Sequence, residues 1–141
     1  MTSSNEEPLT AQLQEIIDEF DCVAGTLHRA EDDGLALVAD VGIPEPVLER
    51  IQLVPIGKGM AGLAAERREP VQVCNLQTDD SGVAEEGARA TGMEGSIAAP
   101  IVGPDDELAG VIGIAKPDAY EFSDEECEAI VQAGADLVSD L

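Results

Sequence analysis

The chain has 141 residues, of which 44% are hydrophobic and 2% aromatic, so we expect one domain with an aliphatic core and no stacking surface for single-stranded nucleic acid. Its 30 acidic and 7 basic residues give a net charge of −23, which would repel nucleic acid and anionic membranes. The acids are spread along the chain and lysines are scarce. This pattern indicates either a halophilic protein, whose self-repulsion is screened by a high-salt cytoplasm, or an ordinary acidic bacterial protein.

The cysteines and the N-terminus indicate the compartment. Cys22, Cys74 and Cys127 show no C-x-x-C spacing, and an odd number of cysteines is typical of reduced thiols in the cytosol. The first ten residues are polar and acidic, unlike a secretory leader. No apolar run approaches the ~20 residues that span a bilayer. We therefore expect a cytoplasmic protein without a membrane or nucleic-acid partner.

The first half of the chain predicts a helix, a β-hairpin and a short helical segment. Residues 1–8 are expected to form a disordered tail, and apolar residues then recur at helical spacing up to Phe20. Residues 22–30 and 35–42 are rich in β-formers and flank the turn sequence EDDG, which is typical of a hairpin. Pro44 and Pro46 open one or two helical turns.

The second half predicts a short helix, a strand, a long loop, a second hairpin and a final helix. The short helix spans residues 59–69 and ends at Pro70, and a strand follows at 71–76. Residues 75–95 are expected to form a loop with one helical turn near 83–90, and such long loops are usually functional. After the hairpin, Ser123 and Glu126 form a capping box. The order indicates an α+β fold with a largely antiparallel sheet.

Three glycines, Gly57, Gly59 and Gly62, match the pattern G-x-G-x-x-G. A dinucleotide site needs a strand before this motif, a full crossover helix after it and an acid about 20 residues further on. Residues 51–54 could form that strand, but the following helix is short and no doubly wound sheet follows it. We therefore interpret the motif as a turn in which Gly57 and Gly59 take positive φ and Gly62 lets the helix pack closely on the sheet.

Four segments in order resemble GAF domains: residues 57–76 (GKGMAGLAAERREPVQVCNL), 95–101 (GSIAAPI), 108–117 (LAGVIGIAKP) and 121–138 (EFSDEECEAIVQAGADLV). The resemblance covers nearly the whole chain, so residues 9–141 are expected to be a single GAF-like domain. It implies a PAS-like central antiparallel sheet with helices packed on one face. On the other face it implies a pocket that residues 75–95 roof.

The resemblance also implies a function. Many GAF domains are sensors that bind a small molecule, so we expect a signalling domain that acts by binding, without catalysis, as a homodimer with a separate signalling partner. It identifies no ligand or cofactor. Two alternatives stay open. One is a structural dimerisation module with no ligand. The other is a thiol-dependent reductase of a small oxidised metabolite such as free methionine sulfoxide.

Departures from the family pattern bear on the reductase and on bound pigments. By resemblance, Arg89 stands where the reductases have their nucleophilic cysteine, and Ala61 stands in place of a resolving cysteine, so only Cys74 could carry that chemistry. Cys74 ends a strand and is expected to be buried, which disfavours bilin attachment. His28 is expected at the surface or an edge of the first hairpin, which disfavours haem. No cysteines or histidines have metal-ligand spacing, so no metal site is expected.

The resemblance places a mixture of apolar and polar residues around the pocket, which suits a small metabolite. Two of them are basic, which in so acidic a chain favours a small anion. The alternative is that Arg89 pairs with Glu85 or Glu86 on the surface. The predicted ligand-binding residues are Lys58, Met60, Cys74, Asn75, Arg89, Met93, Glu94 and Ser96.

Overall fold

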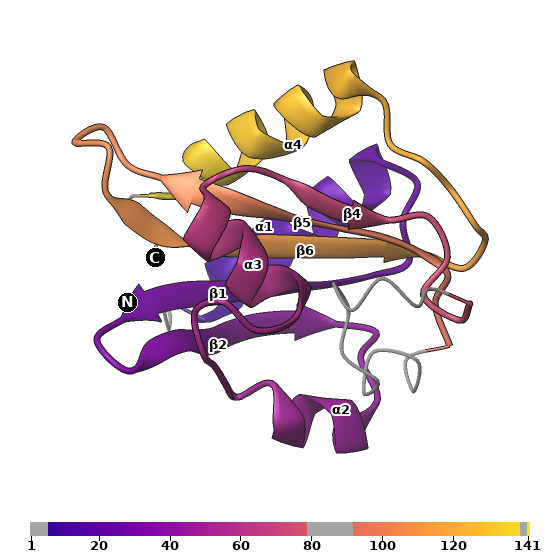
Figure 1. Cartoon of the computed structure of the whole chain (residues 1–141), viewed down its shortest axis with the longest axis horizontal. Helices are drawn as coiled ribbons and strands as arrows, with labels where there is room; N and C mark the ends of the chain where they lie inside the picture. Colours follow the sequence, from indigo (N-terminus) through magenta and orange to yellow (C-terminus); the bar gives the residue numbers. More distant parts are fainter. Residues whose placement is uncertain (1–5, 79–91, 139–140) are drawn as a thin grey trace.

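A computed structural model describes residues 6–78, 92–138 and 141 (Figure 1). Six antiparallel strands form one sheet in the order β3-β2-β1-β6-β5-β4, which confirms the predicted α+β fold. The elements in chain order are α1 (Glu6–Glu19), β1 (Ala24–Glu31), β2 (Gly34–Val41), α2 (Glu45–Arg50), β3 (Leu53–Val54), α3 (Gly59–Arg67), β4 (Val71–Val73), β5 (Gly95–Val102), β6 (Leu108–Lys116) and α4 (Asp124–Ala135).

The predicted elements are present, with shifts at their ends. Helix α1 begins at Glu6, so residues 6–8 of the expected tail form its first turn, where Pro8 is tolerated because the N–H groups there lack helical acceptors. Helix α3 ends before Pro70, because Arg68 takes a left-handed conformation with φ of 59°. The helical turn expected near 83–90 lies outside the described residues. None of the described helices is long and apolar enough to cross a membrane.

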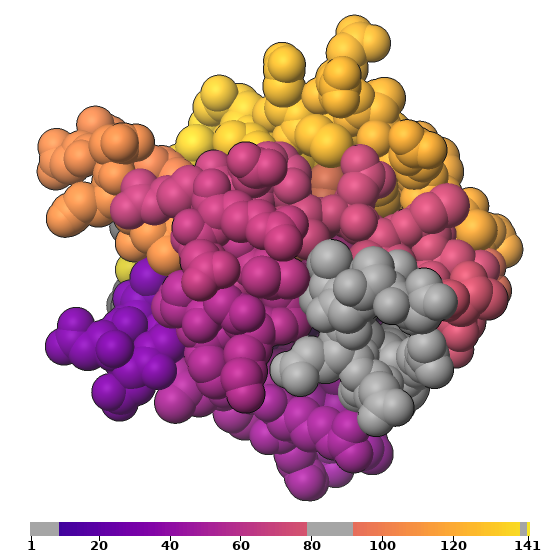
Figure 2. Space-filling model, in the orientation of Figure 1, coloured from indigo at the N-terminus to yellow at the C-terminus, as the bar shows by residue number. Residues whose placement is uncertain are grey.

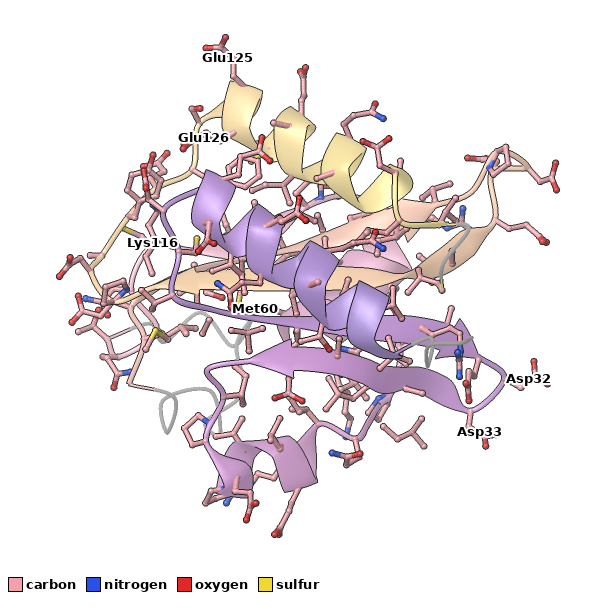
Figure 3. The ribbon with its side chains drawn as sticks, turned by 180° about the vertical axis from the view of Figure 1, so that it is seen from behind. Asp32, Asp33, Met60, Lys116, Glu125 and Glu126 are labelled. Carbon is pink, nitrogen blue, oxygen red and sulfur yellow. The ribbon has the colours of Figure 1, made fainter. Side chains whose placement is uncertain are left out.

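The sheet separates two layers of packing. Helices α1 and α4 cover one face, as seen from behind in Figure 3, and α3 covers part of the other. The larger core lies under α1 and α4 and includes Leu13, Leu27, Ile112 and Ile130, none of them exposed. The smaller core lies under α3 and is built largely from alanine and valine. The α3 face is therefore filled with less side-chain volume.

The glycine motif forms the turn into α3, as predicted, although one glycine has a different role. Gly57 and Gly59 have φ of 93° and 68°, which side chains rarely adopt. A Cβ on Gly62 would meet the carbonyl oxygen of Pro55, and the Gly57 N–H donates to the Gly62 oxygen at 2.8 Å. Gly62 therefore lets the helix approach the preceding turn, rather than the sheet as the sequence suggested.

The predicted capping box joins α4 to the rest of the fold. Glu126 accepts from the Ser123 N–H at 2.9 Å, and its own N–H donates to the Ser123 hydroxyl at 3.1 Å. The Tyr120 hydroxyl also donates to the Glu126 carboxylate, at 2.7 Å. The ammonium group of Lys116 lies 4.4 Å from the Tyr120 ring centre and donates to the Phe20 carbonyl at the end of α1. Glu126 at the start of α4 thus bonds Tyr120, whose ring lies against Lys116 of β6, and Lys116 in turn bonds the residue that follows α1.

Glu126→Ala should lower the melting temperature by roughly 3–5 °C, as expected for loss of a helix cap in a small domain. Glu125→Ala is the matched control, because Glu125 lies in the same helical turn but points away from the protein (Figure 3). The bonds from Ser123 and then Tyr120 lower the pKa of Glu126. Its contribution is therefore complete above the ordinary glutamate pKa and is lost as the pH falls through the lowered value. Equal melting temperatures for the two variants at pH 7 would contradict this role.

Candidate functional site

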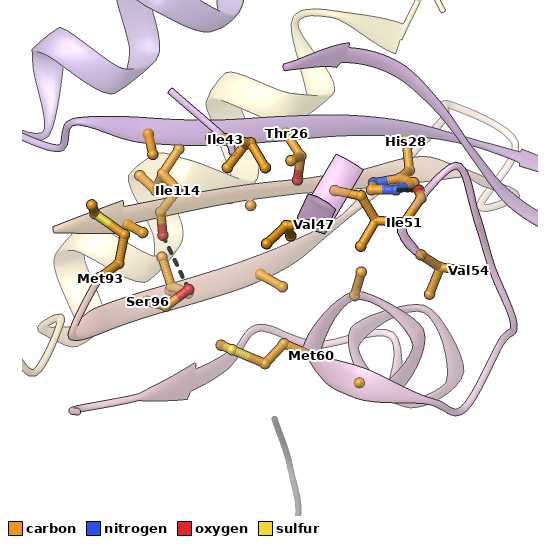
Figure 4. A pocket seen from close by; sticks show the side chains of 18 of the residues that line it. Thr26, His28, Ile43, Val47, Ile51, Val54, Met60, Met93, Ser96 and Ile114 are labelled. Atoms are coloured by element: carbon orange, nitrogen blue, oxygen red, sulfur yellow. Dashed lines mark hydrogen bonds between the residues drawn. The ribbon is translucent and has the colours of Figure 1, made fainter. Parts of the chain in front are cut away.

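A cavity of about 530 Å³ lies on the α3 face of the sheet (Figure 4). Strands β1, β6 and β5 form its floor, residues 43–51 around α2 (the α2 segment) form one wall, and the first turn of α3 forms another. Leu76 and Met93, which flank the undescribed residues 79–91, also line it. The cavity thus lies on the face where the sequence placed a pocket.

The cavity exists because the central strands carry small residues on this face. In β6, Ile112 belongs to the core under α1 and α4, whereas Gly113 lines the cavity. Thr26 and Ala98 are its partners on the adjacent strands, so one row of the sheet floor holds only small side chains. The next row is also small, since it consists of Ala24, Ala115 and Ser96.

The walls of the cavity are apolar. Figure 4 shows Val47 and Ile51 from the α2 segment above the floor, with Met60 of α3 across from them. Met93 lies at the end of the cavity opposite His28. Methionine side chains adapt to different ligand shapes, so these walls suit an apolar body without setting its outline strictly.

The charged residues at the cavity are all basic among those that the structure describes. Arg50 and Lys58 line it and are exposed to solvent, which places their charged ends at the rim. Gly59, Met60 and Ala61 also line it, and they form the first turn of α3, whose N–H groups have no acceptor within the helix. Two cations and a helix N-terminus therefore place positive charge at the rim of the cavity, in a chain of net charge −23.

His28 is buried beside the cavity, and the expectation of a surface or edge position was wrong. The side chain is 2% exposed because it faces the α2 segment from a central part of β1. Its Nε2 lies 2.9 Å from the carbonyl oxygen of Ile51, so Nε2 carries the hydrogen and donates it. Burial lowers the pKa of His28, which keeps the ring neutral at pH 7. Nδ1 is buried and has no hydrogen-bond partner among the residues that the structure describes.

Of the predicted ligand-binding residues, Lys58, Met60, Met93 and Ser96 line the cavity. Cys74, Asn75 and Glu94 are not among the lining residues: the Asn75 side chain accepts the Gln77 N–H at 2.9 Å within its own turn. Arg89 lies outside the described residues.

The prediction missed the residues that reach the cavity from β1 and the α2 segment. The alternation of side chains along β1 could have identified those of β1: Leu27 faces the core under α1 and α4, so Thr26 and His28 face the cavity. The missed residues include Thr26, His28, Ile43, Val47, Arg50 and Ile51.

None of the three cysteines lines the cavity. Cys22 lies in the core under α1, where burial raises its pKa to about 11. Cys127 lies on α4 beyond the opposite face, and burial raises its pKa too. Cys74 is exposed, so the expectation that it is buried was wrong; it follows the end of β4. Within the described residues, no group of three or more His, Cys, Asp or Glu side chains could hold a metal ion.

The family model described as "GAF domain" matches residues 3–139. The chain belongs to the GAF domain family. No curated protein matches the sequence. Solved structures share the fold at low identity. The GAF domain of a phosphoenolpyruvate-protein phosphotransferase from Coxiella burnetii has a TM-score of 0.77 and 20% identity, over 99% of this chain and 83% of that one.

Two further solved structures share the fold, and one of them is a reductase. The type II free methionine-R-sulfoxide reductase from Thermoplasma acidophilum has a TM-score of 0.75 and 17% identity, over 98% of this chain and 94% of that one. The reduced form of fRMsr from Staphylococcus aureus has a TM-score of 0.66 and 21% identity, over 100% and 99% of the two chains. At these identities the likeness shows the shared fold alone.

Proposed function

We propose that this GAF domain binds a small organic molecule in the cavity and signals through that binding, without catalysis. The observation that carries the proposal is the cavity itself, about 530 Å³ in volume, with apolar walls and few polar groups. Such a composition is typical of small-molecule sites. We further propose that the domain works in the cytoplasm as a homodimer and passes its signal to a separate protein.

The charges around the cavity support an anionic ligand. Arg50 and Lys58 are two of only seven basic residues, and no described lining residue is acidic. Among the described residues the ion pair is Arg29–Glu31, and neither Arg50 nor Lys58 forms one with a carboxylate of that part of the chain. In a small organic anion with an apolar body, the anionic group would complement the positive charge at the rim and the apolar body would complement the walls.

The positions of the cysteines support binding over reduction. A thiol reductase needs a reactive thiolate beside its substrate, in an electropositive and accessible setting. Cys22 and Cys127 belong to the opposite side of the sheet and have raised pKa values, and Cys74 is exposed and is not among the lining residues. Turnover of free methionine sulfoxide that disappears in Cys74→Ser would overturn the binding proposal.

Lys58→Ala should weaken binding of a small carboxylate about tenfold, which is the usual effect of losing one charge-assisted hydrogen bond. The control is Arg67→Ala, which removes the same charge from the last turn of the adjacent helix, outside the lining residues. Calorimetry with a panel of aliphatic and aromatic carboxylates in molar KCl measures both. If no carboxylate binds the parent protein, or if both variants bind the carboxylates equally well, the proposal of an anion site at Lys58 is wrong.

A further inference from the structure

We propose that His28 recognises the ligand: its Nδ1 accepts a hydrogen bond, so the cavity selects an organic anion that also carries an O–H or N–H donor. This inference rests on the proposed function and narrows its ligand class. It assigns a recognition role to a residue that the sequence alone placed at the surface or an edge of the first hairpin. The anionic group and the donor group would be held by different elements, α3 and β1.

The first observation is that the hydrogen bonding of His28 is incomplete. Nε2 donates to the Ile51 carbonyl at 2.9 Å, whereas the buried Nδ1 has no partner in the described structure. Buried polar atoms are nearly always paired in folded proteins, and an exception requires a reason. Holding the end of α2 requires Nε2 alone, so the structural role of His28 does not account for the free Nδ1.

The second observation is the position of the ring. His28 lines the same cavity as the first turn of α3, and Figure 4 shows it beside Ile51 and Val54, at one end of the cavity. Thr26 precedes it by two residues on the same face of β1, and its hydroxyl has no hydrogen-bond partner among the described residues. The wall at this end of the cavity therefore holds a buried acceptor, Nδ1, and a hydroxyl, neither of which is paired with another described residue.

The protonation state determines what His28 can bind. Because a carbonyl oxygen only accepts, the bond to Ile51 fixes the hydrogen on Nε2 and leaves a lone pair on Nδ1. A neutral ring in this tautomer accepts from a hydroxyl or amide group, and it gives a carboxylate no hydrogen at Nδ1. Since Nδ1 is covered from solvent in this structure, the ligand must displace part of the cavity wall, and the new bond offsets that rearrangement.

The experiment uses matched carboxylates that differ by one hydroxyl: 2-hydroxy-3-phenylpropionate against 3-phenylpropionate, and 2-hydroxy-4-methylpentanoate against 4-methylpentanoate. His28 is the single histidine, so ¹⁵N-histidine labelling gives one imidazole signal. Met60 and Met93 line the cavity, and their ¹³C-labelled methyl groups report occupancy without involving His28. All titrations are done on the full chain in molar KCl at pH 7.

We expect the free protein to show the Nε2–H tautomer. A hydroxylated acid should shift the Nδ1 resonance and bind about tenfold more tightly than its matched acid. In His28→Gln, an amide N–H can still reach Ile51 but the ring acceptor is gone, so the preference should disappear while the methionine signals still report binding. If His28→Gln does not fold, the Nδ1 shift in the parent protein decides.

Three results would overturn the proposal in distinguishable ways. If both members of a pair shift the methionine methyl signals equally and Nδ1 does not move, His28 has no recognition role, and the cavity remains a binding site. If none of the four compounds shifts the methionine signals, the anion site itself fails, and the role of His28 fails with it. An Nδ1–H tautomer in the free protein would also contradict the proposal.

Discussion

Gly62→Ala should lower the free energy of unfolding by about 2–3 kcal/mol, as expected when an added methyl group overpacks a tight site. The added Cβ would meet the carbonyl oxygen of Pro55 and lie 3.0 Å from the Gly57 nitrogen. Both are backbone atoms of the turn, so neither can move away without shifting the start of α3. Helix propensity predicts the opposite sign, because alanine is favoured over glycine inside a helix by about 1 kcal/mol.

Gly103→Ala is the matched control for this experiment. Gly103 lies in the turn between β5 and β6, where a Cβ would meet its nearest neighbour, Val138, at an ordinary 3.6 Å. Urea unfolding of both variants at pH 7 in molar KCl measures the difference. If Gly62→Ala stabilised the protein, the turn and the helix would not be in the close contact described, and helix propensity would determine the sign of the effect.

Raising KCl from 10 mM to 1 M should increase the melting temperature by about 10 °C, the shift that roughly 2–3 kcal/mol causes in a domain of this size. The physical reason is the net charge of −23, whose repulsion extends over about 30 Å at 0.01 M salt but only about 3 Å at 1 M. KCl is preferable to sulfate, because sulfate also strengthens apolar burial.

The structure brings acidic residues of two separate turns to the same end of the molecule. The β1–β2 turn contains Asp32 and Asp33, the β5–β6 turn contains Asp105 and Asp106, and both turns project from the same end of the molecule (Figure 2). The double variant Asp32→Asn, Asp33→Asn should therefore melt higher than the parent in 10 mM KCl and equally in 1 M. A melting temperature of the parent that does not change with KCl would remove the halophilic interpretation.

Sequence alone determined the features that depend on neighbours in the chain. The capping box needs only Ser123 and the residue three positions later, and the same pair bonds in the structure. The left-handed turn before α3 depends on Gly57 and Gly59, whose conformations follow from their own missing side chains. The two hairpins were also visible as β-rich segments on either side of short polar turns, and their order indicated the antiparallel sheet.

The tertiary structure alone decided the composition of the cavity and the state of His28. The partner of His28 is the carbonyl of Ile51, 23 residues away, and no local pattern indicates that contact. Gly113 becomes a floor residue because the pairing register sets it between Thr26 and Ala98. These contacts join segments that only the register of the sheet and the packing of α2 and α3 bring together. The sequence therefore predicted a pocket on the correct face, whereas the polar residues inside it depended on contacts between distant segments.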